Sequence, residues 1–461
     1  MGVPTRLLVV GADGAGMSAA HQALRTARRL GRELEVVAVD AGRHTSYSAC
    51  GIPYWMAGDV ASGDDLVART ADEHRAAGVD LRLETEAVEI DRDGQRVRVR
   101  SASGESWLGY DELVLATGAE PVLPDWARTP GVLPVHTLDD GAAWRRVLDE
   151  RSPRRALVVG AGYVGVEGAE SLRRRGLDVT LVTRGHEPMS TTMSADMAAM
   201  VREALQRMGV RVVTGTTVES LETAADGRVG AACLGDHEEP VDVVVVAIGV
   251  RPRVQAAVDA GIPLGDHGGL VTDDHQRLAD GVWAAGDCCE VYDRVLQEHW
   301  YTPLGTHANK AGRVAGTNVG GGDAAFAGSV GTAITRAHDA EVARTGMLPS
   351  WARERGLDVE SVTLQSTTAS GYMPEADPMT VQVLGERGTG RLLGAQVVGG
   401  RGAGKRIDVV AMALWGGMTA ADVAAADLAY APPFSPTLDP VAVACRKARR
   451  APVGPPRAPG Q

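Results

Sequence analysis

A chain of 461 residues exceeds what one hydrophobic core supports, so its length predicts about three domains. The net charge of -12 argues against nucleic acid or an anionic membrane as the main partner, and no apolar run approaches a membrane span. The five cysteines are scattered and form no Cys-x-x-Cys pair, so we expect no metal site and no disulfide framework. A strand begins near the N-terminus and no secretory signal is visible, which predicts a cytoplasmic protein.

The first predicted unit is a strand, a glycine turn and a helix. The apolar run Leu7–Val10 breaks into Gly11-Ala12-Asp13-Gly14-Ala15-Gly16 and continues as an Ala-rich helix. Such a helix start binds a pyrophosphate through free N–H groups and the helix dipole. A second strand, Glu35–Val39, ends at Asp40, which is placed to bind ribose hydroxyls. Asp13 stands where the G-x-G-x-x-G pattern has its second glycine.

The next stretch, Thr45 to Tyr54, carries a single cysteine, Cys50, and no second cysteine nearby. Taken alone, Cys50 reads as a small buried hydrophobe. Nucleotide-binding patterns on both sides of this stretch favour a redox role instead. Further on, Asp93-Gly94 joins two alternating strands as a hairpin, and a buried strand then closes at Ala116-Thr117-Gly118.

A second unit repeats the first. A strand, Ala156–Val159, enters Gly160-Ala161-Gly162-Tyr163-Val164-Gly165, an unbroken G-x-G-x-x-G followed by Glu167 on a helix. A hairpin signal at Asp226-Gly227 and an apolar strand ending at Gly249 match the hairpin and the closing strand of the first unit. The repeated order of these features predicts two similar dinucleotide-binding domains.

After the second unit, the chain returns to the first cofactor and then changes character. The segment Gly281 to Asp287 carries a Gly-Asp pair after an apolar strand. From about Ser329, strands alternate with helices and no phosphate loop occurs. The end, from Ala448, is rich in Arg, Pro and Gly and is predicted to be disordered.

These motifs resemble the single-cysteine branch of the pyridine nucleotide-disulfide oxidoreductases, which contains coenzyme A-disulfide reductases, NADH oxidases, NADH peroxidases and persulfide reductases. The likeness covers about Leu7 to Lys447 and includes the Ser-x-x-x-Cys core from Ser46 to Cys50. It implies an α/β fold with two Rossmann-like domains, for FAD and NAD(P)H, and a C-terminal α+β dimerisation domain. The predicted boundaries are 1–125 and 251–328 for the FAD domain, 126–250 for the NAD(P)H domain, 329–447 for the interface domain and 448–461 for the tail.

The resemblance also implies a relay in which NAD(P)H reduces FAD, and reduced FAD passes electrons to Cys50. A helix start and the flavin would both lower the pKa of Cys50. The predicted cofactor-binding residues are Gly11, Asp13, Gly14, Gly16, Asp40, Thr117, Gly118, Gly286 and Asp287 for FAD, and Gly160, Gly162, Gly165, Glu167 and Arg184 for the nicotinamide nucleotide.

The choice of nicotinamide nucleotide depends on the end of the strand Val179–Val182. Thr183 stands where an acid would favour the 2′-hydroxyl of NADH, and Arg184 follows it. Arg184, together with His186, would pair with the 2′-phosphate of NADPH. The alternative is that Arg184 is a solvated surface residue.

By resemblance to coenzyme A-disulfide reductases, Ser18, Gln22, Arg25 and Ser46 would bind substrate. Tyr372 and Tyr430 match tyrosines that assist the departing thiolate across a homodimer, although Tyr372 would equally suit interface packing. Three departures leave the substrate open as a small disulfide, a persulfide, oxygen or peroxide. Ala49 replaces a frequent Asn, Leu438 replaces a phosphate-binding Lys, and Ser435-Pro436-Thr437 replaces the His-Pro-Thr of glutathione reductases.

The leading hypothesis is therefore an FAD-dependent NAD(P)H reductase of coenzyme A disulfide or persulfide. One alternative is an NAD(P)H oxidase or peroxidase in which Cys50 cycles through a sulfenic acid. A flavin-binding redox sensor that acts through a protein partner is the alternative from a different class.

Overall fold

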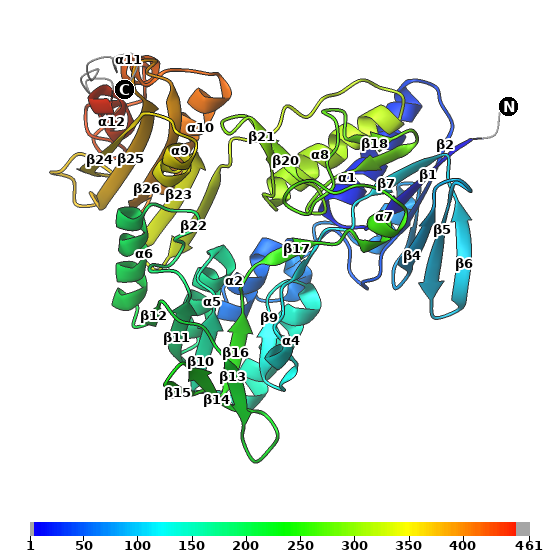
Figure 1. Ribbon diagram of the computed structural model, residues 1–461, viewed down its shortest axis with the longest axis horizontal. Coiled ribbons are helices and arrows are strands. Elements are labelled where there is room, and N and C mark those ends of the chain that lie inside the picture. Colours follow the sequence, from blue (N-terminus) through cyan, green and yellow to red (C-terminus); the bar gives the residue numbers. More distant parts are fainter. Residues whose placement is uncertain (1–3, 449–461) are drawn as a thin grey trace, which may run out of the picture.

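The computed structural model describes residues 4–448 and shows a chain folded into three lobes (Figure 1). The first lobe is built from the beginning of the chain and from residues after about 250, the second from the segment between them, and the third from the C-terminal part. The predicted tail begins at the last residue of a helix, Ala448, and its remaining residues lie outside the described part.

The first lobe has a six-stranded sheet in the order β18-β19-β7-β1-β2-β3, which is parallel except at β18. Two long helices, α1 and α8, pack together on one face of this sheet, and a three-stranded antiparallel sheet of β4, β5 and β6 lies beside it (Figure 1). The bounds are β1 (Thr5–Val10), α1 (Gly14–Arg29), β2 (Leu34–Val39), α3 (Ala71–Ala76), β3 (Val79–Arg82), β4 (Glu86–Asp91), β5 (Arg96–Ser101), β6 (Gly104–Gly109), β7 (Glu112–Leu115), α7 (Gln255–Asp259), β18 (Arg277–Ala279), β19 (Val282–Ala284), β20 (Val291–Asp293), β21 (Glu298–Trp300) and α8 (Gly305–Val319).

The second lobe repeats this plan with a parallel sheet in the order β12-β11-β10-β16-β9. Its run β12-β11-β10-β16 corresponds to β3-β2-β1-β7 of the first lobe. In both lobes a three-stranded antiparallel sheet comes next in the chain, with β4-β5-β6 after β3 and β13-β14-β15 after β12. The predicted duplication is confirmed. The bounds are β9 (Val132–Pro134), α4 (Leu138–Arg151), β10 (Arg155–Val159), α5 (Tyr163–Arg174), β11 (Asp178–Thr183), α6 (Ala195–Arg207), β12 (Arg211–Thr214), β13 (Ser220–Thr223), β14 (Val229–Leu234), β15 (His237–Pro240) and β16 (Val243–Val246).

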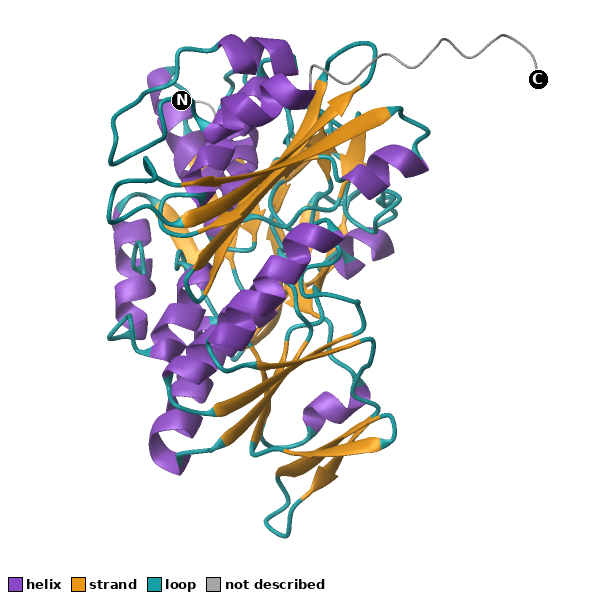
Figure 2. Ribbon diagram, turned by 90° about the vertical axis from the view of Figure 1, so that its left-hand side faces the viewer, coloured by secondary structure: helices purple, strands orange, loops and turns teal. Residues whose placement is uncertain are grey.

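The third lobe is a five-stranded antiparallel sheet in the order β22-β23-β26-β25-β24, with helices against it. Figure 2 shows the long strands of this sheet in its upper half; β26 is buried along its whole length, and β25 is buried at every residue except its two ends. The bounds are β22 (Ala333–Ala337), β23 (Ala340–Gly346), α9 (Pro349–Glu354), β24 (Val359–Thr367), β25 (Pro378–Glu386), β26 (Leu392–Gly399), α10 (Ile407–Trp415), α11 (Ala420–Ala425) and α12 (Pro440–Ala448).

A pair of short strands carries the chain between the first two lobes. β8 (Ala119–Pro121) leads out of the first lobe and pairs antiparallel with β17 (Val250–Pro252), which leads back into it. The two crossings therefore lie side by side, as expected for a domain inserted into another.

One short helix packs in a different lobe from the residues that precede and follow it in the chain. α2 (Ile52–Ala57) follows the Cys50 stretch of the first lobe, yet Ile52 and Met56 lie in the hydrophobic core of the second lobe, beside α5. Figure 1 shows this blue helix within the second lobe. The redox stretch thus spans two nucleotide-binding lobes.

None of the helices within residues 4–448 has both the length and the apolar character to cross a bilayer.

The packing of α1 against α8 generates a stability prediction. A Cβ atom at Gly312 would lie 2.2 Å from the carbonyl oxygen of Ala15, and one at Gly316 would lie 2.2 Å from that of Ala19. These backbone contacts allow the two helices to touch directly, which fixes the start of α1 at the first phosphate loop.

We expect Gly316→Ala to push the helices apart and to destabilise the protein by about 1–3 kcal/mol. Because α1 opens the phosphate loop, FAD retention should fall as well. Thermal unfolding and released flavin after gel filtration measure both effects. Arg313→Ala, at an exposed position of α8, is the control, and equal behaviour of the two variants would contradict the packing argument.

Candidate functional site

The two phosphate loops have the same geometry. Gly11 and Gly160 both adopt a φ of 100°, and a Cβ atom on either would lie within 2.3 Å of a carbonyl oxygen of the closing strand, at Ala116 or Ala247. A Cβ at Gly16 or Gly165 would likewise meet the carbonyl of the first glycine of its loop, at 1.8 and 1.9 Å. Each loop therefore needs its first and last glycine to seat the helix start on the sheet.

Asp13 links the first phosphate loop to the redox stretch. Its carboxylate accepts a hydrogen bond from the backbone N–H of Tyr47 at 3.3 Å, and the hydroxyl of Thr45 donates to the carbonyl of Ala12 at 2.5 Å. Burial raises the pKa of Asp13 to about 6, and the carboxylate of Asp40 adds to the rise. Asp13 therefore supports the redox loop in addition to its predicted place at the cofactor.

Asp40 lies at the end of β2, as predicted, and its carboxylate accepts the backbone N–H groups of Ala12 and Gly42, each at 2.7 Å. Thr117 and Gly118 both contact Arg253, where the chain re-enters the first lobe. The Thr117 hydroxyl donates to the Arg253 carbonyl at 2.5 Å, and the Gly118 carbonyl accepts the Arg253 N–H at 3.0 Å. Cofactor contacts of these residues stay predictions.

Asp287 provides a test of whether the site suits FAD. Burial raises the pKa of its carboxyl to about 6, and no group within residues 4–448 donates a hydrogen bond to it. A buried carboxyl with free acceptor positions fits a ligand that brings hydroxyl donors, as the ribityl chain of FAD does. The residues therefore fit the predicted cofactor.

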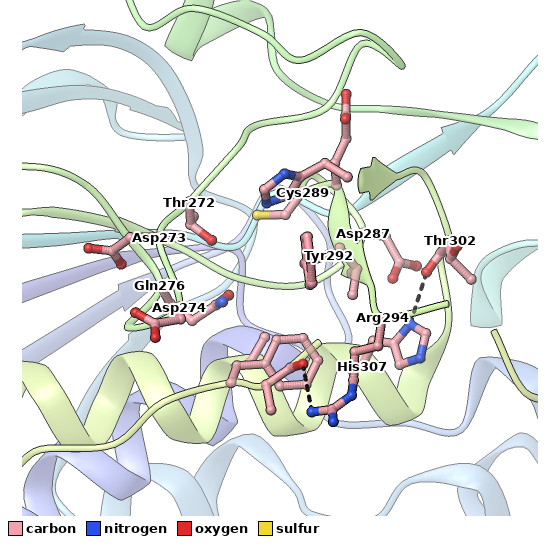
Figure 3. A pocket seen from close by; sticks show the side chains of 17 residues that line it. Thr272, Asp273, Asp274, Gln276, Asp287, Cys289, Tyr292, Arg294, Thr302 and His307 are labelled. Carbon is pink, nitrogen blue, oxygen red and sulfur yellow. Dashed lines mark hydrogen bonds between the residues drawn. The ribbon is translucent and has the colours of Figure 1, made fainter. Parts of the chain in front are cut away.

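A cavity of about 450 Å³ adjoins Asp287 (Figure 3). Asp273, Asp274 and Gln276 line one side, and Asp287, Thr302 and His307 lie around the other. The His307 Nδ1 donates to the carbonyl of Thr302 at 3.2 Å, so its Nε2 accepts the hydroxyl of Ser329 at 2.9 Å. Burial lowers the pKa of His307, which keeps this ring neutral.

Cys50 occupies a single helical turn, Ala49–Gly51, immediately before α2. Three contacts hold α2 on the second lobe. The hydroxyl of Ser171 donates to the carbonyl of Pro53 at 2.7 Å, Arg145 donates to the carbonyl of Trp55 at 3.2 Å, and Arg174 pairs with Asp59 just beyond the helix. Cys50 itself is exposed.

The polypeptide around Cys50 opposes formation of the thiolate. Partial burial among protein atoms raises the pKa of the Cys50 thiol, and the carboxylates of Glu167 and Asp287 raise it further. The expectation that a helix start lowers this pKa is wrong for the polypeptide alone, because α2 is short and these two effects outweigh it. Because Asp287 belongs to the first lobe and Glu167 to the second, their joint effect places the Cys50 thiol between these two lobes.

Glu167, predicted to bind the nicotinamide nucleotide, connects the second and third lobes. Its carboxylate accepts the hydroxyl of Thr335 on β22 at 2.7 Å, and burial raises its pKa. One turn further along α5, Glu170 pairs with Arg336 at 2.8 Å and accepts the N–H of His338 at 3.0 Å. Three lobes therefore meet at the redox stretch.

The four predicted substrate residues lie along α1 and the redox loop. The Ser18 hydroxyl donates to Asn309 of α8 at 2.9 Å, and Arg25 donates to Gln22 at 3.3 Å. Ser46 contacts a residue that the sequence did not single out, His74 of α3, at 2.9 Å. Substrate binding by these residues stays a prediction.

Tyr372 and Tyr430 lie together on the third lobe, although 58 positions separate them (430 minus 372). The neighbouring polar side chains of Thr437, Ser370 and Tyr372 lower the pKa of Tyr430. Both rings are exposed, and neither forms a hydrogen bond with Cys50 in the described part of a single chain. Their predicted action across a dimer stays a prediction.

Arg184 follows the end of β11, as predicted, and its side chain is exposed. The hydroxyl of Thr183 accepts the N–H of Gly185 at 3.2 Å, and Glu187 is paired with Arg202 at 2.7 Å. Within residues 4–448 the Arg184 side chain forms no salt bridge and no hydrogen bond, so its charge is available for a bound anion.

Thr335 could not be identified from the sequence, because its contact with Glu167 depends on how the third lobe docks. His74 was also missed. The pattern from Thr70 to Glu73 is a capping box that indicates a helix start, but it does not reveal which loop that helix faces.

Comparison with known proteins identifies the family. Residues 5–310 match the family described as pyridine nucleotide-disulphide oxidoreductase, and residues 333–442 match its dimerisation domain. The chain is similar to a coenzyme A polysulfide/persulfide reductase that uses NAD(P)H, from Pyrococcus horikoshii. The two are 31% identical over 96% of this chain and 98% of the relative. It is similar to an NADH oxidase from Methanocaldococcus jannaschii, with 30% identity over 96% and 98% of the two chains.

Among solved structures, an NAD-dependent persulfide reductase from A. fulgidus superimposes with a TM-score of 0.93 at 35% identity, over 96% of this chain and 83% of that one.

The Glu167 carboxylate near Cys50 generates a prediction on thiol reactivity. Glu167→Gln removes a negative charge that raises the pKa of Cys50 and retains an amide oxygen for Thr335. We expect the pH midpoint of Cys50 alkylation to move to lower pH in the variant holoenzyme. Mass spectrometry of iodoacetamide-treated protein across a pH series measures it. Glu150→Gln, at an exposed position of α4, is the control; an unchanged midpoint in Glu167→Gln would contradict the assignment.

Proposed function

Because this chain belongs to the pyridine nucleotide-disulphide oxidoreductase family, we propose that it reduces a small-molecule disulfide or persulfide of the coenzyme A kind at the expense of NADPH. FAD and NAD(P)H are the cofactors of this family, and bound FAD relays two electrons from the nicotinamide to sulfur. One observation carries the proposal. The exposed thiol of Cys50 lies under the combined field of Glu167 and Asp287, one from each nucleotide-binding lobe.

No second thiol stands beside Cys50. Cys288, Cys289 and Cys445 are buried, Cys233 lies half-buried on β14, and among all five only Cys288 and Cys289 contact each other, at 3.8 Å. A substrate sulfur must therefore take the place of the resolving cysteine.

Cys50 thiolate would attack one sulfur of the disulfide, forming a Cys50–substrate mixed disulfide and expelling the other half as a thiolate. Two electrons and one proton then cleave the mixed disulfide, returning the Cys50 thiolate and releasing the second half as a thiol. The sum is one NADPH, one proton and one disulfide consumed, with one NADP⁺ and two thiols formed. With a persulfide, the products are one thiol and hydrogen sulfide.

The substrate class rests on two supports. Relatives similar over nearly the whole chain include the Pyrococcus horikoshii coenzyme A polysulfide/persulfide reductase. Ser18, Gln22 and Arg25 lie on one helix, α1, whose start also opens the first phosphate loop. A thiol tail along α1 would therefore direct its sulfur toward the loop of Cys50.

Oxidase activity is the second candidate, favoured by the similarity to the Methanocaldococcus jannaschii NADH oxidase and by the exposure of Cys50. In that case Cys50 cycles through a sulfenic acid. NADPH oxidation measured against disulfides, persulfides, peroxide and oxygen separates the two. Fast turnover with oxygen or peroxide and slow turnover with every sulfur substrate would replace the reductase proposal.

A homodimer would complete the site. The third lobe exposes Tyr372, Tyr430, Phe434, Leu438 and Met412, a set of large apolar side chains that a partner subunit would cover. The lowered pKa of Tyr430 makes its hydroxyl a better proton donor to a departing thiolate than an ordinary tyrosine.

The first prediction from this proposal concerns Cys50. Cys50→Ser should retain FAD and allow NADPH to bleach the flavin, because neither phosphate loop changes. Disulfide reduction should fall by orders of magnitude, since a serine hydroxyl is a poor nucleophile toward sulfur near neutral pH. Stopped-flow flavin absorbance measures flavin reduction by NADPH, and thiol release measures disulfide reduction. Cys233→Ser is the control, and full disulfide reduction by Cys50→Ser would overturn the mechanism.

The second prediction concerns Arg184. Arg184→Ala should raise the KM for NADPH about 10- to 100-fold and leave that for NADH nearly unchanged, because a charge-assisted hydrogen bond to the 2′-phosphate is lost. Steady-state kinetics with both nucleotides measures the difference. Arg146→Ala, on the exposed side of α4, should change neither. Equal effects of Arg184→Ala on the two nucleotides would place Arg184 outside the phosphate site.

A further inference from the structure

Four side chains form a continuous hydrogen-bonded chain behind the redox loop. The Ser46 hydroxyl meets Nε2 of His74 at 2.9 Å, and Nδ1 of His74 meets Nε2 of His21 at 2.6 Å. Nη1 of Arg69 reaches the same Nε2 of His21 at 3.2 Å. His74 is buried at the centre of this relay, with 1% of its surface exposed. We call these four residues the histidine relay.

We infer that His74, oriented by His21 and Arg69, is a positioning residue that fixes Ser46 as a hydrogen-bond acceptor toward the substrate of Cys50. This inference rests on the proposed function, because it takes Ser46 as a contact of the disulfide substrate.

The direction of every hydrogen bond in the relay follows from Arg69. A guanidinium only donates, so Nε2 of His21 must be unprotonated to accept from Arg69. That nitrogen cannot donate to His74, so the proton between the two rings belongs to Nδ1 of His74, and the one lone pair of His21 Nε2 is shared between the two donors, at 2.6 and 3.2 Å. A neutral imidazole carries one proton, which leaves Nε2 of His74 as an acceptor. The Ser46 hydroxyl must then donate to His74.

Electrostatics keeps the relay neutral near neutral pH. Burial lowers the pKa of His74 to about 4, and His21 and Arg69 lower it too, against the opposing carboxylate of Glu73. The pKa of His21 is also lowered, first by burial and then by Arg69 and Arg25. Glu73 is itself held at the start of α3, where it accepts the Thr70 N–H at 2.8 Å.

The backbone at Ser46 has an unusual conformation that neighbouring contacts hold in place. Ser46 has a φ of 47°, in the left-handed region that non-glycine residues rarely adopt. Its carbonyl accepts the N–H of Ala68 at 2.8 Å, and Ser48 donates to Leu66 at 2.8 Å. These bonds and His74 together hold the loop in this conformation, four residues before Cys50.

The orientation of the Ser46 hydroxyl determines which kind of substrate group can form a hydrogen bond with it. With its proton committed to His74, the Ser46 oxygen offers lone pairs and no donor. An amide N–H on the tail of the substrate thiol fits this oxygen, whereas a phosphate, which only accepts near neutral pH, does not. Ser46 therefore selects for an amide-bearing thiol and against a phosphate at this point.

The tautomers can be read directly in the holoenzyme labelled with ¹⁵N at histidine. Long-range ¹H–¹⁵N spectra at pH 7.5, assigned with His21→Gln and His74→Gln, should show His21 and His74 both protonated on Nδ1. In Arg69→Met the constraint on His21 disappears, and His74 should shift toward the Nε2–H form. Arg69→Lys, which keeps a cationic donor, should retain the wild-type pattern.

Kinetics supplies the second readout. Arg69→Met should raise the KM for an amide-bearing disulfide about 3- to 10-fold with little change in flavin reduction by NADPH. For diethyl disulfide, which has no hydrogen-bond donor, the KM should stay near that of the wild type. Arg69→Lys should restore the KM for the amide-bearing disulfide.

The outcomes separate the relay from the proposed function. His74 protonated on Nε2 in the wild type, or an unchanged tautomer in Arg69→Met, would overturn the relay. An equal rise in KM for both disulfides would also overturn it. The expected tautomers in an enzyme that reduces no disulfide would overturn the proposed function instead, together with the substrate role of Ser46.

Discussion

The docking of α2 on the second lobe is the constraint on which the site depends. Ile52 and Met56 enter the hydrophobic core beside α5, and the Arg174–Asp59 pair closes the far end of the helix. Removing these apolar side chains from water supplies a stabilisation that loop contacts alone could not, roughly 1.5–3 kcal/mol for each large side chain. Because Cys50 immediately precedes α2, this docking holds a thiol of the first lobe against a helix of the second.

The negative charges near the Cys50 thiol disfavour its thiolate form. Glu167 and Asp287 both raise the pKa of Cys50, and burial raises the pKa values of these two carboxyls in turn. A ligand that donates hydrogen bonds to Asp287, or a cation that approaches Glu167, would reduce the repulsion. Occupation of the nucleotide sites is thus coupled to the fraction of thiolate at Cys50.

Much of the fold could be predicted because its signals are local. The apolar runs before Gly11 and Gly160 and the hairpin at Asp93-Gly94 depend only on neighbouring residues, and the strands appear where expected. The order of the motifs then identified the repeat. The docking of α2 could not be predicted, since Ile52 and Met56 read equally well as core residues of either lobe. Neither could the thiol pKa, because the effect of Glu167 on Cys50 arises from packing between segments far apart in the sequence.

The third lobe contributes contacts within its own chain and also exposed side chains that a partner subunit could contact. Through β22 it acts within its own chain, where Thr335 binds Glu167 and Arg336 pairs with Glu170. Through the loops that carry Tyr372 and Tyr430, it exposes two phenol side chains to solvent. Under the proposed function, one lobe would hold the carboxylates of its own site in place and offer a proton donor to the site of a partner. If Cys50 is the one redox cysteine of each chain, as proposed, this division is a physical reason for the protein to act as a dimer.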